Sequence, residues 1–162
     1  MRSIGAPKRS PAARGSLARR MVVLALDLGA KRIGLAISDA GERIAFPAGV
    51  LPSQGRARDV AAVAQVMQER SIGRVVIGLP LHMSGRRGPE AEAAQRFADE
   101  LAASTGVPVE TLDERWTSRE AERSLRELGR SSKKRARGEV DSLAATLLLR
   151  AFLERRARSS VP

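Results

Sequence analysis

The stretch LALDLGAKRIGLAISD, residues 24–39, predicts the centre of a β-sheet. Two apolar runs, residues 22–28 and 33–38, flank Gly29-Ala30-Lys31-Arg32, a pattern typical of two strands joined as a hairpin. Asp27 is the one carboxylate in the first run, and a buried strand tolerates an isolated charge poorly. The position of Asp27 therefore raises the question of what neutralises its charge.

Strand-like and helix-like segments follow in a regular order. We expect further strands at residues 45–51, 75–78 and 107–112, and helices at residues 56–70, from about 89 onward, at 118–128 and at 139–156. In the last helix the apolar residues form one stripe, Val140, Leu143, Ala144, Leu147, Leu148, Ala151 and Phe152. This order predicts an α/β fold with one five-stranded mixed sheet, antiparallel over its first three strands and flanked by helices.

The chain of 162 residues is long enough for one domain. Residues 1–20 are rich in Pro, Gly, Ser and Arg, so we expect a disordered basic tail before a single domain at residues 21–158. Arg19-Arg20 faintly resembles a twin-arginine export signal, but Asp27 interrupts the apolar stretch and no small-residue cleavage site follows. No run of about eighteen apolar residues occurs, so we expect a cytoplasmic protein with no membrane partner.

The net charge of +11 is concentrated in a few segments. Six basic residues and no acid lie in residues 1–20, and five more lie in residues 130–137. Such segments favour a polyanion, and therefore nucleic acid, as the partner, although an arginine-rich composition explains part of the excess. Base stacking on aromatic side chains is disfavoured because the chain has one Trp, three Phe and no Tyr. The absence of Cys excludes disulfides, thiolate metal sites and a cysteine nucleophile.

Three acidic residues occupy positions that are unfavourable for charge in a folded core. Asp27 ends the first strand, Glu114 follows the last strand, and Asp141 lies in the first turn of the final helix. If the first and last strands are close neighbours at the carboxyl edge of the sheet, these acids meet there. Clustered carboxylates raise one another's pKa unless a cation neutralises them, and oxygen ligands suit Mg²⁺ or Mn²⁺. We therefore predict that Asp27, Glu114 and Asp141 are both metal ligands and catalytic residues.

Each acid considered alone has a simpler interpretation. An Asp at a strand end usually shapes a turn, which is the role we expect for Asp39, and an Asp in a first helical turn usually complements the helix dipole. His82, the only histidine, is expected to be solvated. Exposed cations are expected to contact phosphates along the nucleic acid, although solvated charge is the alternative. These residues are Lys31, Arg32, Arg86, Arg87, Lys133, Lys134, Arg135 and Arg137.

Four blocks of the sequence resemble a known family. They are LALDLGAKRIGLAISD (24–39), VVIGLPLHMSGRRGPEAE (75–92), LDERWTSREAERSL (112–125) and VDSLAATLLLRAFL (140–153). In this order and spacing they resemble the YqgF family, described both as Holliday junction resolvases and as pre-16S rRNA nucleases. The resemblance spans about residues 22–156 and implies a ribonuclease H-like fold and a metal-dependent endonuclease. It also implies that Asp27, Glu114 and Asp141 are the acidic metal-site residues.

The resemblance further suggests that Arg115 and Thr117 shape the same edge, with Arg115 contacting nucleic acid. This chain departs from the family in the loop after the fourth strand, where His82 and Ser84 replace the usual Asn and Asp. A role carried by the family's loop aspartate therefore does not transfer to this chain.

Two other functions stay open. The first is an rRNA- or DNA-binding assembly factor whose acidic site is idle. The second is an actin-like ATPase or sugar kinase, whose first hairpin looks similar, but those proteins need two such domains and would leave Glu114 and Asp141 without a role. The sequence does not choose between precursor rRNA and branched DNA. Symmetric resolution of a junction needs two active sites and hence a homodimer, whereas trimming an rRNA end needs one.

Overall fold

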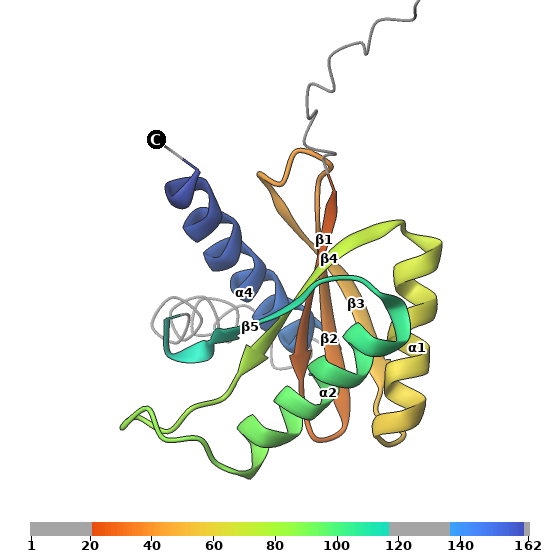
Figure 1. Ribbon diagram of the computed structural model, residues 1–162, viewed down its shortest axis with the longest axis vertical. Helices are drawn as coiled ribbons and strands as arrows, with labels where there is room; N and C mark the ends of the chain where they lie inside the picture. The colour runs from red at the N-terminus through yellow and green to blue at the C-terminus, as the bar shows by residue number, and fades with distance from the viewer. Residues whose placement is uncertain (1–20, 117–136, 161–162) are drawn as a thin grey trace, which may run out of the picture.

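The computed structural model describes residues 21–116 and 137–160 (Figure 1). The predicted tail, the predicted helix at 118–128 and residues 130–136 of the basic loop lie outside the described residues. The strands are β1 (Val22–Leu28), β2 (Arg32–Ser38), β3 (Ala45–Pro52), β4 (Ile72–Leu79) and β5 (Val109–Asp113). The helices are α1 (Arg56–Glu69), α2 (Pro89–Thr105), the 3-10 turn η1 (Glu114–Trp116) and α4 (Arg137–Ser159). Within the described ranges, no helix is long and apolar enough to cross a membrane.

The five strands form one mixed sheet in the order β3-β2-β1-β4-β5. β1, β2 and β3 pair antiparallel, as predicted, and β4 and β5 run parallel to β1. β4 lies between β1 and β5, so the first and last strands are one strand apart and their carboxyl ends meet at the same edge of the sheet. Short helical connections place successive parallel strands side by side, which puts β4 next to β1 and β5 beyond it.

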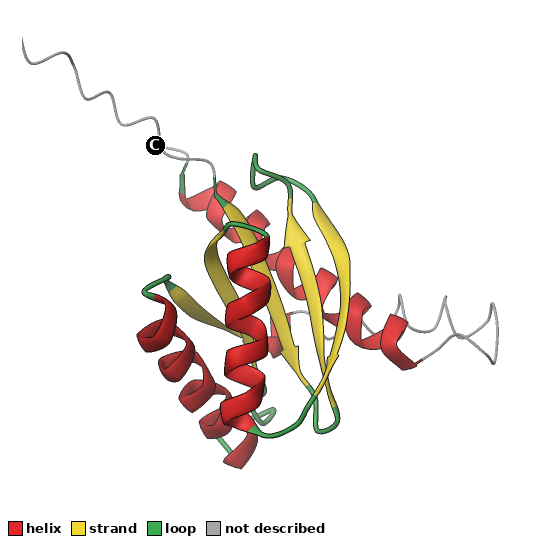
Figure 2. Ribbon diagram, turned by 90° about the vertical axis from the view of Figure 1, so that its right-hand side faces the viewer, coloured by secondary structure: helices red, strands yellow, loops and turns green. Residues whose placement is uncertain are grey.

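Helices cover both faces of the sheet, with α1 and α2 on one side and α4 on the other (Figure 2). Successive residues of β1 alternate between the two cores: Leu24 and Leu26 pack with α1 and α2, whereas Val23 and Ala25 pack with α4. All four side chains are fully buried. A strand buried on both faces needs apolar residues at every position, which explains the unbroken apolar run before Asp27.

The buried face of α4 agrees with the predicted stripe only in part. Leu147, Leu148 and Phe152 are buried as predicted, whereas Leu143 and Ala144 are only half-buried. Ala145 and Leu149, outside the predicted stripe, are fully buried. The reason is polar: the Ser142 hydroxyl donates a hydrogen bond of 3.1 Å to the carbonyl of Leu35 in β2, and Ser142 is itself buried. The face of α4 that contains Ser142 therefore lies against the sheet. A prediction based on apolar residues alone does not include this face.

Candidate active site

Asp27 lies at the carboxyl end of β1, on the face that α4 covers. It pairs in register with Gly34 of β2. A Cβ atom added to Gly34 would lie 2.1 Å from the backbone oxygen of Asp141, so only glycine leaves room for the α4 backbone at this point. Gly34 therefore lets α4 approach the sheet closely enough to place Asp141 beside Asp27.

Glu114 reaches the same position from the other side. It follows β5 directly, and its side chain lies over Gly78 of β4: a Cβ atom there would lie 2.3 Å from Glu114 Oε1. The missing side chain of Gly78 therefore gives Glu114 a path across β4 toward Asp27. Neither Gly34 nor Gly78 stands out in the sequence, because their importance depends on strand register rather than on a local motif.

The carboxyl groups of Asp27 and Glu114 lie close enough to interact, and they can share a hydrogen bond when one of them is protonated. Burial raises the pKa of Asp27, and the negative charge of Asp141 raises it further. Burial, followed by the charge of Asp27, raises the pKa of Glu114 to about 7. With a pKa of about 7, Glu114 is about half protonated at neutral pH, and its proton can bridge the two carboxyl groups. This proton offsets part of the negative charge at the site.

Asp141 is paired differently from the other two acids. Its Oδ2 atom accepts a 2.7 Å hydrogen bond from Nε of Arg32, and both side chains are about one-third exposed, at 30% and 34%. In the part of the chain that the structure describes, no three acidic or histidine side chains are grouped tightly enough to hold a metal ion as they stand. The structure thus brings the three predicted acids to one edge, with Asp141 bound to Arg32.

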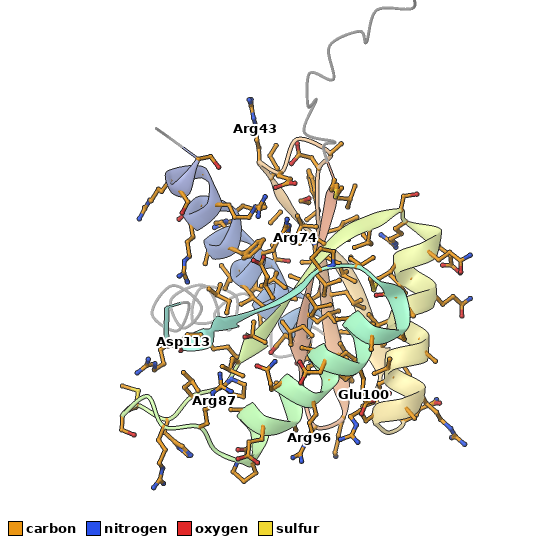
Figure 3. All side chains as sticks on the ribbon, in the orientation of Figure 1. Arg43, Arg74, Arg87, Arg96, Glu100 and Asp113 are labelled. Atoms are coloured by element: carbon orange, nitrogen blue, oxygen red, sulfur yellow. The ribbon has the colours of Figure 1, made fainter. Side chains whose placement is uncertain are left out.

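The predicted basic residues that can be placed lie around the same edge. Lys31 lies in the β1–β2 turn, Arg32 begins β2, and Arg86 and Arg87 belong to the loop after β4. Figure 3 shows Arg87 on the loop after β4, with Arg43 at the opposite end of the molecule. Lys133, Lys134 and Arg135 lie outside the described residues, and Arg137 is placed only as the first residue of α4.

Arg115 is bound within the protein. Its Nη2 and Nε atoms donate hydrogen bonds of 2.6 and 2.8 Å to Asp113 Oδ2. This contact holds the pKa of Asp113 below its usual value. The geometry gives Arg115 a structural role at the edge of the site, in addition to the predicted contact with nucleic acid.

Two other polar residues have the roles expected of them. Asp39 accepts hydrogen bonds from the backbone N–H groups of Gly41, Arg43 and Ile44, so its role in the turn after β2 is confirmed. His82 is exposed to solvent, as expected.

The sheet order and the two helical layers define a ribonuclease H-like fold. Thermus thermophilus RuvC in complex with a Holliday junction substrate has a similar structure, with a TM-score of 0.56 and 19% identity over 85% of this chain and 96% of that chain. The model of the RuvX family, described as Holliday junction resolvase, matches residues 21–155. The chain therefore belongs to the RuvX family, and the resemblance of the four sequence blocks is confirmed.

Curated relatives agree with this assignment. Proteins named "Putative pre-16S rRNA nuclease" occur in Chloroflexus aurantiacus strain J-10-fl and Anaeromyxobacter dehalogenans strain 2CP-C. The first is 47% identical and covers 87% of this chain and 90% of its own length. The second is 46% identical and covers 85% of this chain and 99% of its own length. The chain thus spans nearly the whole length of both relatives.

Proposed function

We propose that this chain is a divalent-metal-dependent endonuclease that hydrolyses phosphodiester bonds in structured nucleic acid. The observation that carries the proposal is the convergence of Asp27, Glu114 and Asp141 at one edge, through the space left by Gly34 and Gly78. Family membership and the names of the relatives support the same reaction class. The substrate is the 5′ end of pre-16S rRNA, a Holliday junction, or both, and either substrate places the protein in the cytoplasm.

The donor atoms of the site fit Mg²⁺ or Mn²⁺. Asp27, Glu114 and Asp141 offer only carboxylate oxygens, the ligands that such hard cations prefer. The raised pKa values of Asp27 and Glu114 show that negative charge is unfavourable at this position. One shared proton offsets only part of that charge, and a divalent cation would offset more. When bound, the ion would polarise the phosphodiester and lower the pKa of an attacking water.

The residues of the chain prepare the site in two ways. Glu114 has to release its proton before its oxygens can act as ligands. Asp141 offers a cation only Oδ1 while Arg32 holds Oδ2, and the Arg32 guanidinium also suits a phosphate group. A substrate phosphate that takes Arg32 frees the Asp141 carboxylate for the cation. Substrate and metal are therefore expected to favour each other's binding.

The basic residues around the edge hold the substrate. Lys31 and Arg32 follow the carboxyl end of β1, and Arg86 and Arg87 follow that of β4, at the edge where phosphates would approach. Arg115 and the basic residues of positions 133–137 complete the proposed phosphate-binding surface. Contacts of this kind position the nucleic acid without reading its sequence.

A cleavage assay tests the proposal. Purified protein is incubated with a four-way DNA junction or a 5′-extended small-subunit rRNA precursor, with Mg²⁺ or with Mn²⁺. Wild type is expected to cut at least one substrate. Asp27→Asn, Glu114→Gln and Asp141→Asn are each expected to abolish cleavage while keeping the fold, as judged by circular dichroism. Asp99→Asn is the matched control and should cut normally, because Asp99 is an exposed carboxylate on α2, on the other face of the sheet from α4.

The outcomes separate the nuclease from the binding-only alternative. Binding without cleavage in either metal would favour an assembly factor with an idle site. Two acid variants with near-normal activity would show that the site is assigned wrongly. Paired symmetric cuts in the junction, with a dimer in solution by light scattering, would identify a homodimeric resolvase.

A further inference from the structure

The loop of residues 81–88 joins β4 to α2 and presents an apolar side chain to solvent. Met83 is 92% exposed, more than any other large hydrophobic residue in the described ranges. A single exposed apolar residue carries no meaning by itself, because such residues are common on protein surfaces. The structure around Met83 supplies the further observations.

The loop is a tight, hydrogen-bonded turn. Leu81 and Arg87 form an antiparallel bridge, and the His82 N–H donates a 3.1 Å hydrogen bond to the Arg86 carbonyl. The Gly85 N–H donates a 2.7 Å hydrogen bond to the His82 carbonyl, which closes a β-turn with Met83 and Ser84 at its centre. Gly85 has a φ of +82°, a conformation that glycine adopts without strain. Met83 is therefore held at the tip of an ordered turn.

Arg115 connects this turn to the acidic edge. Its guanidinium binds Asp113, the residue before Glu114, and its Nη1 atom lies 3.5 Å from the carbonyl oxygen of Met83. The same Nη1 atom lies 3.2 Å from the position that a Cβ atom on Gly85 would occupy. This contact joins the turn that carries Met83 to the residue that follows Glu114.

The charge beside Met83 suits nucleic acid. Arg86 and Arg87 are both exposed, and neither has an acidic partner among the described residues. The two arginines can bind backbone phosphates, and the exposed methionine beside them can contact a base of the same strand. Methionine is one of the side chains that proteins insert between base steps, and its sulfur makes favourable contacts with aromatic rings.

We propose that Met83 is a wedge that packs against an unstacked base beside the cleaved phosphodiester, while Arg86 and Arg87 bind the flanking phosphates. The inference rests on the proposed nuclease function, because it places the base next to the carboxylates of that site. It also states which substrate feature is recognised: a branch or an unpaired step, where a base can leave the stack at small cost.

Fluorescence of 2-aminopurine, which rises when the base leaves the stack, tests the wedge. The probes are the four-way DNA junction and the 5′-extended rRNA precursor, each with 2-aminopurine beside the step that wild type cuts. The protein carries Asp27→Asn, so that it binds without cutting. Binding is expected to raise the emission with Met83 or with Met83→Leu, and not with Met83→Ala. Met83→Ala removes a contact between sulfur and an aromatic ring. Its loss is expected to weaken binding of the probe by roughly two- to tenfold.

Ile44→Ala is the matched control, because Ile44 is also exposed, at 55%, and lies beside Arg43 at the opposite end of the molecule (Figure 3). It should leave both emission and affinity unchanged. If the Met83→Ala protein raises the emission as much as the protein with Met83, the wedge is excluded, whatever the affinity. That result would leave the proposed nuclease function intact. If wild type neither binds nor cuts either probe, the proposed function fails first, and the wedge fails with it.

Discussion

Among the residues that the structure describes, Glu114 is the one whose side-chain pKa is raised to about 7. Its pKa is raised from 4.5 to about 7, so between these pH values the folded protein keeps a proton that the unfolded chain has released. The free energy of unfolding of the metal-free protein should therefore fall as the pH rises through this window, and the penalty is complete above pH 7. The charge on Glu114 thus destabilises the metal-free protein at alkaline pH.

Glu114→Gln is expected to remove this penalty. Without metal, the variant should be more stable than wild type at pH 8 by about 1–2 kcal/mol, allowing for partial solvent screening, and the difference should shrink toward pH 5. Thermal unfolding in the presence of a chelator at both pH values measures the effect. A variant that is less stable than wild type at pH 8 would contradict the protonated pair of Glu114 and Asp27.

Gly34 and Gly78 should respond differently to the same substitution. Gly34→Ala places a methyl group against the α4 backbone, which cannot shift without moving the helix, so a loss of about 1–3 kcal/mol of stability is expected. Gly78→Ala meets only the flexible end of Glu114, so stability should change little while cleavage is lost. Urea unfolding and the cleavage assay separate the two effects. Equal stability losses in both variants would argue against the placement of Glu114 over Gly78.

At the scale of secondary structure, the sequence predicts the strands and helices well where the pattern is local. The β1–β2 hairpin is defined by its own residues, and β4 and β5 differ from the predictions by a few residues at their ends. The position of β4 between β1 and β5, and the polar face of α4, depend on contacts between distant segments. The Arg32–Asp141 pair joins residues 109 positions apart, a separation that no local motif reveals.

This pair between β2 and α4 should restrain metal binding in the absence of substrate. Arg32→Gln frees the Asp141 carboxylate, so Mn²⁺ affinity of the substrate-free protein should rise, while affinity for nucleic acid should fall because a phosphate contact is lost. Isothermal titration calorimetry and a filter-binding assay measure the two quantities. Arg56→Gln, which breaks an exposed pair with Glu100 on the other face, is the control. Unchanged Mn²⁺ affinity in Arg32→Gln would show that the pair does not restrain Asp141.

At the scale of the whole molecule, the positive charge predicts salt-dependent binding. Neutralising Arg130, Lys133, Lys134, Arg135 and Arg137 should weaken binding for all sequences alike, and the slope of log affinity against log salt should fall by about 0.7–0.9 per lost phosphate contact. This prediction rests on charge alone, since the side chains lie outside the described residues. Neutralising Arg58 and Arg70 of the α1 region is the control. An unchanged slope would show that these basic residues are solvated and do not contact phosphates.

The acidic site is expected to be completed by cation and nucleic acid together. Three features support this coupling: the proton shared by Asp27 and Glu114, the contact of Asp141 with Arg32, and the basic residues around the edge. Mg²⁺ and Mn²⁺ are commonly held by one or two carboxylates plus substrate phosphate, so the substrate-free site is expected to bind them weakly. Linkage requires that substrate and metal raise each other's affinity by the same factor.

Calorimetric titration with Mn²⁺, in the presence and absence of a non-cleavable substrate, measures that factor directly. We expect much tighter Mn²⁺ binding with substrate in wild type and a much smaller gain in Asp141→Asn, which has lost one of the ligands that substrate releases. Equal Mn²⁺ affinity with and without substrate in wild type would contradict the coupling of cation and nucleic acid and favour a protein that binds nucleic acid without cutting it.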